Sequence, residues 1–147
     1  MIQSRKTETQ SNIESILERH DVRVTPVRQL VLRFISNSSC PVSAQEIEDA
    51  LETVDRSSIT RTLSLFTEAH IIHQISDGSG SKRYELCLDA ESERHNDEHA
   101  HFHCRKCGKT YCLPDAPVFF PAIPVGYKAE SISVILTGFC SSCNEYD

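Results

Sequence analysis

The chain has 147 residues, enough for one ordinary domain or two small ones, which excludes a large multidomain protein. Hydrophobic residues make up 39% and charged residues 24%, as in a folded globular protein, and no apolar run approaches the ~20 residues of a membrane span. The first ten residues are polar and lack the apolar stretch of a secretory signal, so we expect a cytoplasmic protein without membrane contact.

The charge and the metal-binding residue types narrow the choice further. A net charge of −6 argues against holding nucleic acid by bulk attraction, although it leaves room for a local basic face. Seven Cys and seven His are many for this length. In a cytoplasmic chain the cysteines are better interpreted as metal ligands or redox groups than as a disulfide framework.

Four helices are expected in the first part of the chain, each with a recognisable start. Residues 11–14 and 43–46 have the capping-box pattern, Thr25 precedes a proline at the first helical position, and Asp55 is a good N-cap. The apolar residues expected on the buried faces of these helices are Ile13, Ile16, Leu17, Val27, Leu30, Val31, Phe34, Ile35, Ile47, Ala50, Leu51, Val54, Ile59, Leu63 and Phe66.

A β-hairpin is expected next. Residues 71–75 and 82–86 have strand character, and the turn formers of 76–81 join them. Helices closed by a two-stranded hairpin make the winged variant of helix-turn-helix, whose recognition helix lies in the DNA major groove. That helix would run from Arg56 to Ala69.

The remainder of the chain predicts a second, smaller domain. Residues 89–98 are acidic and polar and are expected to form a linker. Strands are predicted at 101–104, 109–113 and 128–137, the last with Ile132, Val134 and Leu136 inward, and prolines interrupt the stretch between the last two. The predicted fold class is α+β, with a winged helix-turn-helix domain including the hinge at 1–86 and a small α/β domain at 87–147.

Two C-x-x-C pairs predict a metal site in that second domain. They are formed by Cys104, Cys107, Cys140 and Cys143. Each pair can present two thiolates to one ion from a tight turn. Two such pairs around the same ion make the tetrahedral four-sulfur site that suits structural zinc. The alternative is a redox dithiol beside an unrelated pair, but a thioredoxin-like site expects a βαβ setting that this sequence lacks. Cys40 and Cys112 have no assigned role.

Histidines indicate a second site. The segment before the first C-x-x-C pair contains His95, His99, His101 and His103. Alternate residues of a strand share a face, so the last three would point the same way. A surface histidine run without a role is the alternative. His73, Glu85 and Cys87 lie on or just after the hairpin and could complete a mixed imidazole and thiolate site, which suits zinc.

Taken together, these motifs resemble the ferric uptake regulator family. The resemblance spans roughly residues 21–143. It rests, in chain order, on Val24-Thr25-Pro26-Val27-Arg28, Val42-Ser43-Ala44, the helix that contains Arg61, Tyr84-Glu85-Leu86, the run 99–108 with its H-x-H-x-x-C-x-x-C-G pattern, and the closing C-x-x-C. It implies an N-terminal winged-helix domain that binds double-stranded operator DNA as a homodimer. It further implies a C-terminal dimerisation domain and a metal between the two that sets the DNA-binding shape.

The resemblance also assigns ligands. Cys104, Cys107, Cys140 and Cys143 match the family's structural zinc ligands, one ion per chain, and His73, Cys87, His99 and His101 match the sensing site of its zinc-responsive branch. Iron and peroxide sensors of the family usually have a His directly before the segment that matches Val42-Ser43-Ala44, and this chain has Pro41 at that position. Ala100 stands where many relatives have a ligand of a further regulatory site, and a proline-rich stretch replaces a longer helix.

DNA contacts are expected from a local basic face. Residues 19–33 contain four Arg and one Asp, a net +3, although a solvated charged face is the alternative. The candidate DNA-binding residues, with Arg61 foremost, are Arg23, Arg28, Arg56, Ser57, Ser58, Thr60 and Arg61.

The expected function is a zinc-sensing, DNA-binding repressor of metal-uptake genes with a regulatory divalent metal. The alternatives are an iron- or peroxide-responsive regulator of the same family and a zinc-stapled protein-interaction module. Enzymatic zinc hydrolysis would need an open ligand position and a base such as Glu85 or Glu98, but no H-E-x-x-H pattern is present, so we expect no enzyme.

Overall fold

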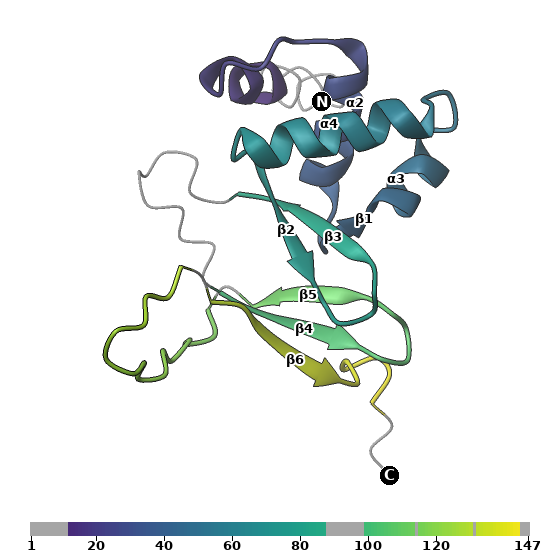
Figure 1. The fold of residues 1–147 in the computed structure, drawn as a ribbon. Helices are drawn as coiled ribbons and strands as arrows, with labels where there is room; N and C mark the ends of the chain where they lie inside the picture. Colours follow the sequence, from purple (N-terminus) through teal and green to yellow (C-terminus); the bar gives the residue numbers. More distant parts are fainter. Residues whose placement is uncertain (1–11, 88–98, 114, 131, 145–147) are drawn as a thin grey trace. The chain divides into compact units, whose positions relative to one another are not determined.

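The chain folds into two compact units, Met1–His95 and Asn96–Asp147. The computed structural model describes residues 12–87, 99–113, 115–130 and 132–144. Helices and a small sheet form the first unit and a second sheet forms the other (Figure 1). The linker predicted at 89–98 lies outside the described residues, and the domain boundary predicted after residue 86 stays a prediction. No helix in the described ranges is long and apolar enough to cross a membrane.

Four helical segments build the N-terminal unit, as predicted. Residues 12–19 are helical, and the others are α2 (Pro26–Asn37), α3 (Ala44–Ala50) and α4 (Arg56–Glu68). The cap predicted at Ser11 lies outside the described residues. The expected recognition helix is thus present as α4.

Local hydrogen bonds explain where α2, α3 and α4 begin. The Thr25 hydroxyl accepts from the Arg28 amide at 3.4 Å, with Pro26 at the first helical position. In α3 the capping box is complete, because the Ser43 hydroxyl accepts from the Glu46 amide at 3.2 Å and the Glu46 carboxylate accepts from the Ser43 amide at 2.7 Å. The Asp55 carboxylate accepts from the amide of Ser58 at 2.9 Å at the start of α4. All three predicted caps are confirmed.

The apolar faces of these helices form one core. From α4 it takes Ile59, Leu63 and Phe66, all predicted, with Phe66 fully buried. The buried residues of α2 are Val31, Leu32 and Ile35. Leu32 was not among the predicted inward residues, and Leu30 is only half-buried. Because α2 contacts both α4 and β3, its buried face is rotated toward Leu32 relative to the simple apolar stripe.

The wing is a three-stranded antiparallel sheet. The predicted hairpin is confirmed as β2 (Ile72–Ser76) and β3 (Lys82–Leu86), and β1 (Val42–Ser43) adds to the outer edge of β3 in the order β1-β3-β2. The two residues of β1 are too few to show a period, so this strand was not predicted.

A buried ion network holds the wing loop to helix α3. The Asp77 carboxylate is fully buried and accepts from Arg83 Nε at 2.9 Å and from the Ser79 amide at 2.9 Å. The same guanidinium donates from Nη1 to Glu46 Oε2 at 3.1 Å. Since Glu46 also caps α3, the wing and the start of that helix are tied together.

The C-terminal unit is a sheet of β4 (Ala100–Cys104), β5 (Thr110–Leu113) and β6 (Val134–Gly138). In the order β5-β4-β6, β5 is antiparallel and β6 parallel to the central strand. The first two strands match their predictions within a residue. With the winged helix-turn-helix unit before it, this sheet confirms the predicted α+β fold class and its two parts.

The third predicted strand is wrong in its extent. The sequence predicts a strand over 128–137 with Leu136 inward, but regular pairing begins only at Val134 and the Leu136 side chain is 49% exposed. The segment before β6 contains a turn with Gly126 at φ +89°, where the Tyr127 amide donates to the Pro124 carbonyl at 3.2 Å. This turn ends just before the predicted strand, and residues 128–130 and 132–133 that follow it do not pair with β4.

Candidate metal centres and nucleic-acid interface

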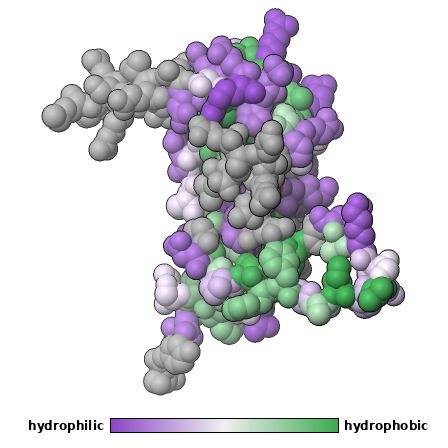
Figure 2. Space-filling view, turned by 90° about the vertical axis from the view of Figure 1, so that its left-hand side faces the viewer, coloured by the Kyte–Doolittle hydropathy of each residue, from purple (hydrophilic) through white to green (hydrophobic). Residues whose placement is uncertain are grey.

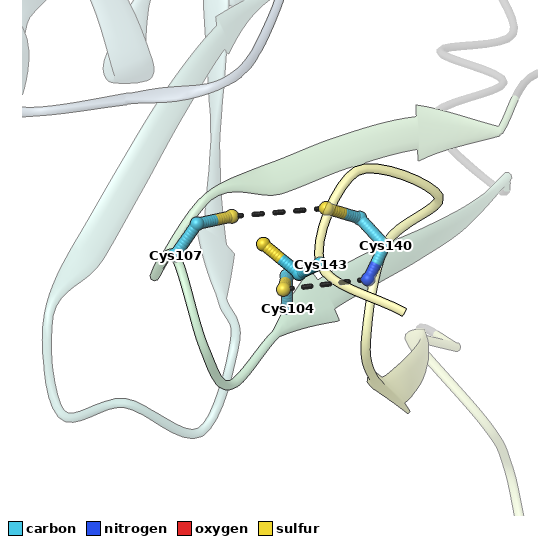
Figure 3. A group of neighbouring side chains, drawn as sticks. All are labelled: Cys104, Cys107, Cys140 and Cys143. Atoms are coloured by element: carbon cyan, nitrogen blue, oxygen red, sulfur yellow. Dashed lines mark hydrogen bonds between the residues drawn. The ribbon is translucent and has the colours of Figure 1, made fainter. Parts of the chain in front are cut away.

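The four cysteines of the two C-x-x-C pairs lie together at one end of the second sheet. Cys104 ends β4, Cys107 lies in the turn that follows, and Cys140 and Cys143 lie in the turn after β6. Parallel pairing of these strands, with Cys104 opposite Gly138, brings both turns to the same end. The four sulfur atoms lie within 4.8 Å of one another and point toward a common centre (Figure 3).

The spacing of the sulfurs fits a tetrahedral ion. The Cys107 and Cys140 sulfurs are 3.9 Å apart. Zn–S bonds of ~2.3 Å at tetrahedral angles place sulfurs ~3.8 Å apart. No disulfide joins any of the seven cysteines, all of which lie in the described part of the chain. The donor set and its geometry therefore fit structural zinc.

Backbone amides prepare this site for thiolates. The Cys140 amide donates to the Cys104 sulfur at 3.3 Å. The amides of Cys107 and Cys140 lower the pKa of the Cys104 thiol to about 6. A hydrogen bond from the Tyr111 hydroxyl lowers the pKa of Cys140, whereas the hydrogen bond of Cys143 to Cys140 raises the pKa of Cys143 to about 12. Hydrogen bonds thus favour the thiolate forms of Cys104 and Cys140 and disfavour that of Cys143, and a bound dication would favour the thiolate form of each ligand.

Tyr111 is a contributor to this site that sequence reasoning missed. Strand alternation places it opposite Phe102 on β4, and its contact with Cys140 depends on how the turn after β6 lies against the sheet. The spacing of Tyr111 along the chain carries no signal of that contact.

The predicted sensing residues form two groups, one on each unit. On the wing, His73 of β2 pairs with Glu85 of β3, with His73 Nε2 2.6 Å from Glu85 Oε1. The Cys87 sulfur lies 3.7 Å from His73 Nδ1. Three donors of different chemistry, nitrogen, oxygen and sulfur, are therefore gathered on the first unit.

The second group lies at the start of β4. The ring centroids of His99 and His101 are 4.5 Å apart, as expected for alternate residues on one face. His103, two residues further, is buried and its Nδ1 lies 3.2 Å from the Thr110 hydroxyl. His103 is thus engaged within the sheet, and His95 lies outside the described residues.

The candidate DNA-binding residues of α4 occupy its exposed face. Arg56, Ser57, Thr60 and Arg61 are exposed and Ser58 is half-buried, while the opposite face of the helix is in the core. Arg56 forms an ion pair with Glu48 at 3.3 Å, and its side chain is 78% exposed. Surface ion pairs contribute little free energy, so a DNA phosphate could take the place of Glu48 beside Arg56.

Two serines near the start of α4 also hold its cap. The hydroxyls of Ser57 and Ser58 donate to the Asp55 carboxylate. They hold the Asp55 pKa well below its usual range. Arg61 Nη2 lies 3.4 Å from the Ser58 hydroxyl, which leaves its other donors available.

Arg23 and Arg28 lie just before and within α2. Arg23 is exposed, whereas Arg28 is half-buried and donates from Nη1 to the Arg23 carbonyl at 2.7 Å. Arg28 therefore stabilises the local backbone, and Arg23 is the better candidate for a phosphate contact.

The sequence is similar to known metal-responsive and peroxide-responsive regulators. The model of the ferric uptake regulator family matches residues 19–118. The peroxide operon regulator of Bacillus subtilis is 25% identical over 137 residues, which cover 88% of this chain and 89% of that protein. The peroxide-responsive repressor PerR of Staphylococcus aureus is 31% identical over 112 residues, covering 74% and 70%.

Solved structures agree in fold. A zinc uptake regulator complexed with zinc and DNA has a TM-score of 0.63 at 21% identity, covering 92% of this chain and 93% of that one. The ferric uptake regulator Fur of Helicobacter pylori has a TM-score of 0.62 at 18% identity, covering 96% and 95%. Identities this low support the likeness in fold alone.

Proposed function

The chain belongs to the ferric uptake regulator family, a family of metal-responsive transcriptional regulators, and we propose that it is a zinc-responsive repressor of metal-uptake genes. The proposal includes a cytoplasmic homodimer on double-stranded operator DNA. It also places the DNA-binding domain at 1–86 and the metal-binding dimerisation domain at 87–147.

The observation that carries the choice of zinc is the sulfur on the wing. Cys87 Sγ lies 3.7 Å from His73 Nδ1, and Glu85 Oε1 lies 2.6 Å from the other ring nitrogen. A carboxylate that accepts from Nε2–H leaves Nδ1 unprotonated on the side of the thiol. An imidazole and a thiolate that face each other are ligands typical of zinc, whereas harder ions prefer oxygen.

His99 and His101 complete the proposed regulatory site. Their rings are adjacent on β4, so two imidazoles can be supplied from the second unit. One ion held by His73 and Cys87 from the wing and by this pair would favour one relative orientation of the two units. Shifting a 1:99 population to 99:1 requires ~5.5 kcal/mol of differential binding, and DNA and metal then strengthen each other's binding.

We assign a separate structural role to the four-cysteine cluster. One zinc ion per chain, held by Cys104, Cys107, Cys140 and Cys143, has all four tetrahedral positions occupied by protein. A site without an open position supplies stability rather than catalysis, so the proposal assigns no enzymatic activity.

A second candidate is an iron- or peroxide-responsive regulator. Two observations favour it: the relatives from Bacillus subtilis and Staphylococcus aureus are named for peroxide, and Glu85 offers an oxygen beside His73. In that case Glu85 rather than Cys87 would ligate the sensing ion. Peroxide treatment of the iron-loaded protein would then add oxygen to a histidine, which mass spectrometry detects.

Metal selectivity tests the proposal directly. An operator is first selected from random DNA, and its dissociation constant is measured with zinc, iron(II) and manganese(II) at fixed salt. We expect the tightest binding with zinc. In Cys87→Asp, which replaces the sulfur by an oxygen donor, the preference should move toward manganese and iron. Cys40→Ser, a change at a half-buried cysteine of the same unit, is the matched control. Equal affinities with and without zinc in the unaltered protein would eliminate the sensing role.

The DNA interface has its own test. Arg61→Ala should cost about 1–3 kcal/mol and relax sequence preference at one base position, because arginine reads a guanine edge with two hydrogen bonds. Arg56→Ala, on the same exposed face, should instead weaken binding to all sequences equally. Identical effects of both variants on specific and random DNA would refute the role of Arg61.

A further inference from the structure

The two cysteine turns of the second unit are joined by direct contacts in addition to the ion they could share. The first turn, residues 104–109, connects β4 to β5, and the second, residues 139–143, follows β6. Thirty-two residues separate Cys107 from Cys140 along the chain. The position of the second turn against the first therefore depends on the contacts between them.

Three successive residues, Gly138 to Cys140, each contact the first turn. The parallel pairing of β4 and β6 ends with Cys104 opposite Gly138. One residue further, the Arg105 amide donates to the Gly138 carbonyl at 2.8 Å, and the guanidinium carbon of Arg105 lies 5.3 Å from the centre of the Phe139 ring. The Cys140 amide then donates to the Cys104 sulfur at 3.3 Å (Figure 3). Among these contacts, only that between Arg105 and Phe139 joins two side chains.

Phe139 is an exposed aromatic residue directly before a candidate zinc ligand. Its side chain is 49% exposed. The other large hydrophobic side chains that are exposed in the described residues also belong to the second unit, and Figure 2 shows hydrophobic surface on this unit. A cation within about 6 Å of the centre of an aromatic ring is attracted by the electrons of the ring face. The contact thus ties Phe139 to the first turn while the Arg105 side chain stays at the surface.

The positive charge of Arg105 suits its place beside the sulfurs. Four thiolates around one dication keep a net negative charge, which a neighbouring cation stabilises. Arg105 follows Cys104 directly, and its contact with Phe139 brings it to the residue before Cys140. Lys109 carries the same charge in the same turn and is also exposed, so it separates the effect of charge from that of the ring contact.

We infer that Arg105 is a positioning residue, which holds the second cysteine turn against the first through Phe139 and thereby slows the release of the structural zinc ion. A four-coordinate ion has no open position, so its release begins when one pair of sulfurs moves away from the other. The inference rests on the structural zinc site proposed above. A zinc sensor needs one site that exchanges with free zinc and another that keeps its ion, and this contact acts on the second.

The two contributions of the Arg105 side chain set the size of the effect. An exposed cation–π contact changes an equilibrium about two- to fivefold. Loss of one nearby positive charge in a hydrated setting adds a factor of about two. Arg105→Gln loses both contributions and should release zinc about four- to tenfold faster. Phe139→Leu keeps an apolar side chain but loses the ring, and it should release zinc about two- to fivefold faster.

The rate of zinc release from the full-length chain tests the inference. The protein is dialysed to one zinc ion per chain, and transfer of that ion to excess EDTA is followed at fixed pH and salt. Arg105→Lys keeps a cation that can lie over Phe139 and should restore most of the slow release. Lys109→Gln removes the same charge without the ring contact and should change the rate no more than about twofold. Combining Arg105→Gln with Phe139→Leu should give no faster release than Arg105→Gln alone, because both changes break one contact.

Hydrogen exchange separates positioning of the turn from a general loss of stability. In zinc-loaded Arg105→Gln the amides of residues 105 and 140, which donate between the turns, should exchange faster, while β5 keeps its protection. Both altered side chains are exposed, so the variants should fold, and circular dichroism checks this.

Four results would overturn the inference. They are an unchanged release rate in Arg105→Gln, equal rates in Arg105→Gln and Lys109→Gln, additive effects in the double variant, and a uniform loss of protection over the whole sheet. Failure of the unaltered chain to hold zinc at its four cysteines would instead refute the structural zinc site, on which the inference rests, and the unaltered protein alone shows that result.

Discussion

Removal of one sulfur from the four-cysteine cluster should unfold the second unit and spare the first. Cys143→Ser replaces a zinc ligand by a hydroxyl that does not ionise. Within the described residues, the N-terminal core holds fourteen buried apolar residues, which at ~1.5–3 kcal/mol each contribute roughly 20–40 kcal/mol before the entropy cost. Among the described residues of the second unit only Ala100, Cys104 and Cys140 are buried apolar side chains, and the last two are candidate ligands.

The magnitudes decide the outcome. Three small buried side chains contribute a few kcal/mol at most, whereas structural zinc binding supplies ~10–16 kcal/mol in small zinc domains. The fold of the second unit therefore depends on the ion, and the first unit has a core of its own. Hydrogen exchange followed by mass spectrometry should show lost protection of the β4 and β6 amides in Cys143→Ser, with α2 and α4 unchanged.

Cys112→Ser is the matched control, because it alters a half-buried cysteine of the same sheet outside the cluster. It should keep its zinc and its amide protection. If β4 and β6 in Cys143→Ser kept the protection of the unaltered protein after zinc loss was verified by elemental analysis, the reasoning from core size would be refuted.

Three further predictions concern the N-terminal unit. Ser43→Ala removes the acceptor for the Glu46 amide and should cost about 1 kcal/mol in urea unfolding, and an unchanged midpoint would contradict the capping argument. Asp77→Ala removes the buried partner of Arg83 and should cost about 3 kcal/mol, against a much smaller loss for the exposed pair in Arg56→Ala. The Asp55 pKa is depressed below its ordinary 3.8, so its contribution to stability is present above that pH and is lost as the pH falls below it. Asp55→Asn, which also caps but does not titrate, should therefore differ less from the unaltered protein in acid than at neutral pH, as chemical unfolding across pH would measure.

The helices of the first unit were predictable from short stretches of sequence. Thr25, Ser43 and Asp55 each satisfy an amide three residues ahead, so the signal and the structure it sets lie within one helical turn. The C-x-x-C pairs are equally local, since each turn alone presents its two sulfurs. For the same reason the hairpin was predicted within a residue, because its strands are neighbours in the chain.

Tertiary structure decided which of these local pieces meet. β6 is shorter than predicted, and it pairs parallel to β4. This pairing brings the two cysteine turns to one end of the sheet. It also leaves Leu136 on the open face beside Phe102, and it places the Tyr111 hydroxyl against Cys140. Such outcomes depend on which strand lies next to which, and the choice of a partner distant in the chain rests on the packing of whole surfaces, which no short run of residues encodes.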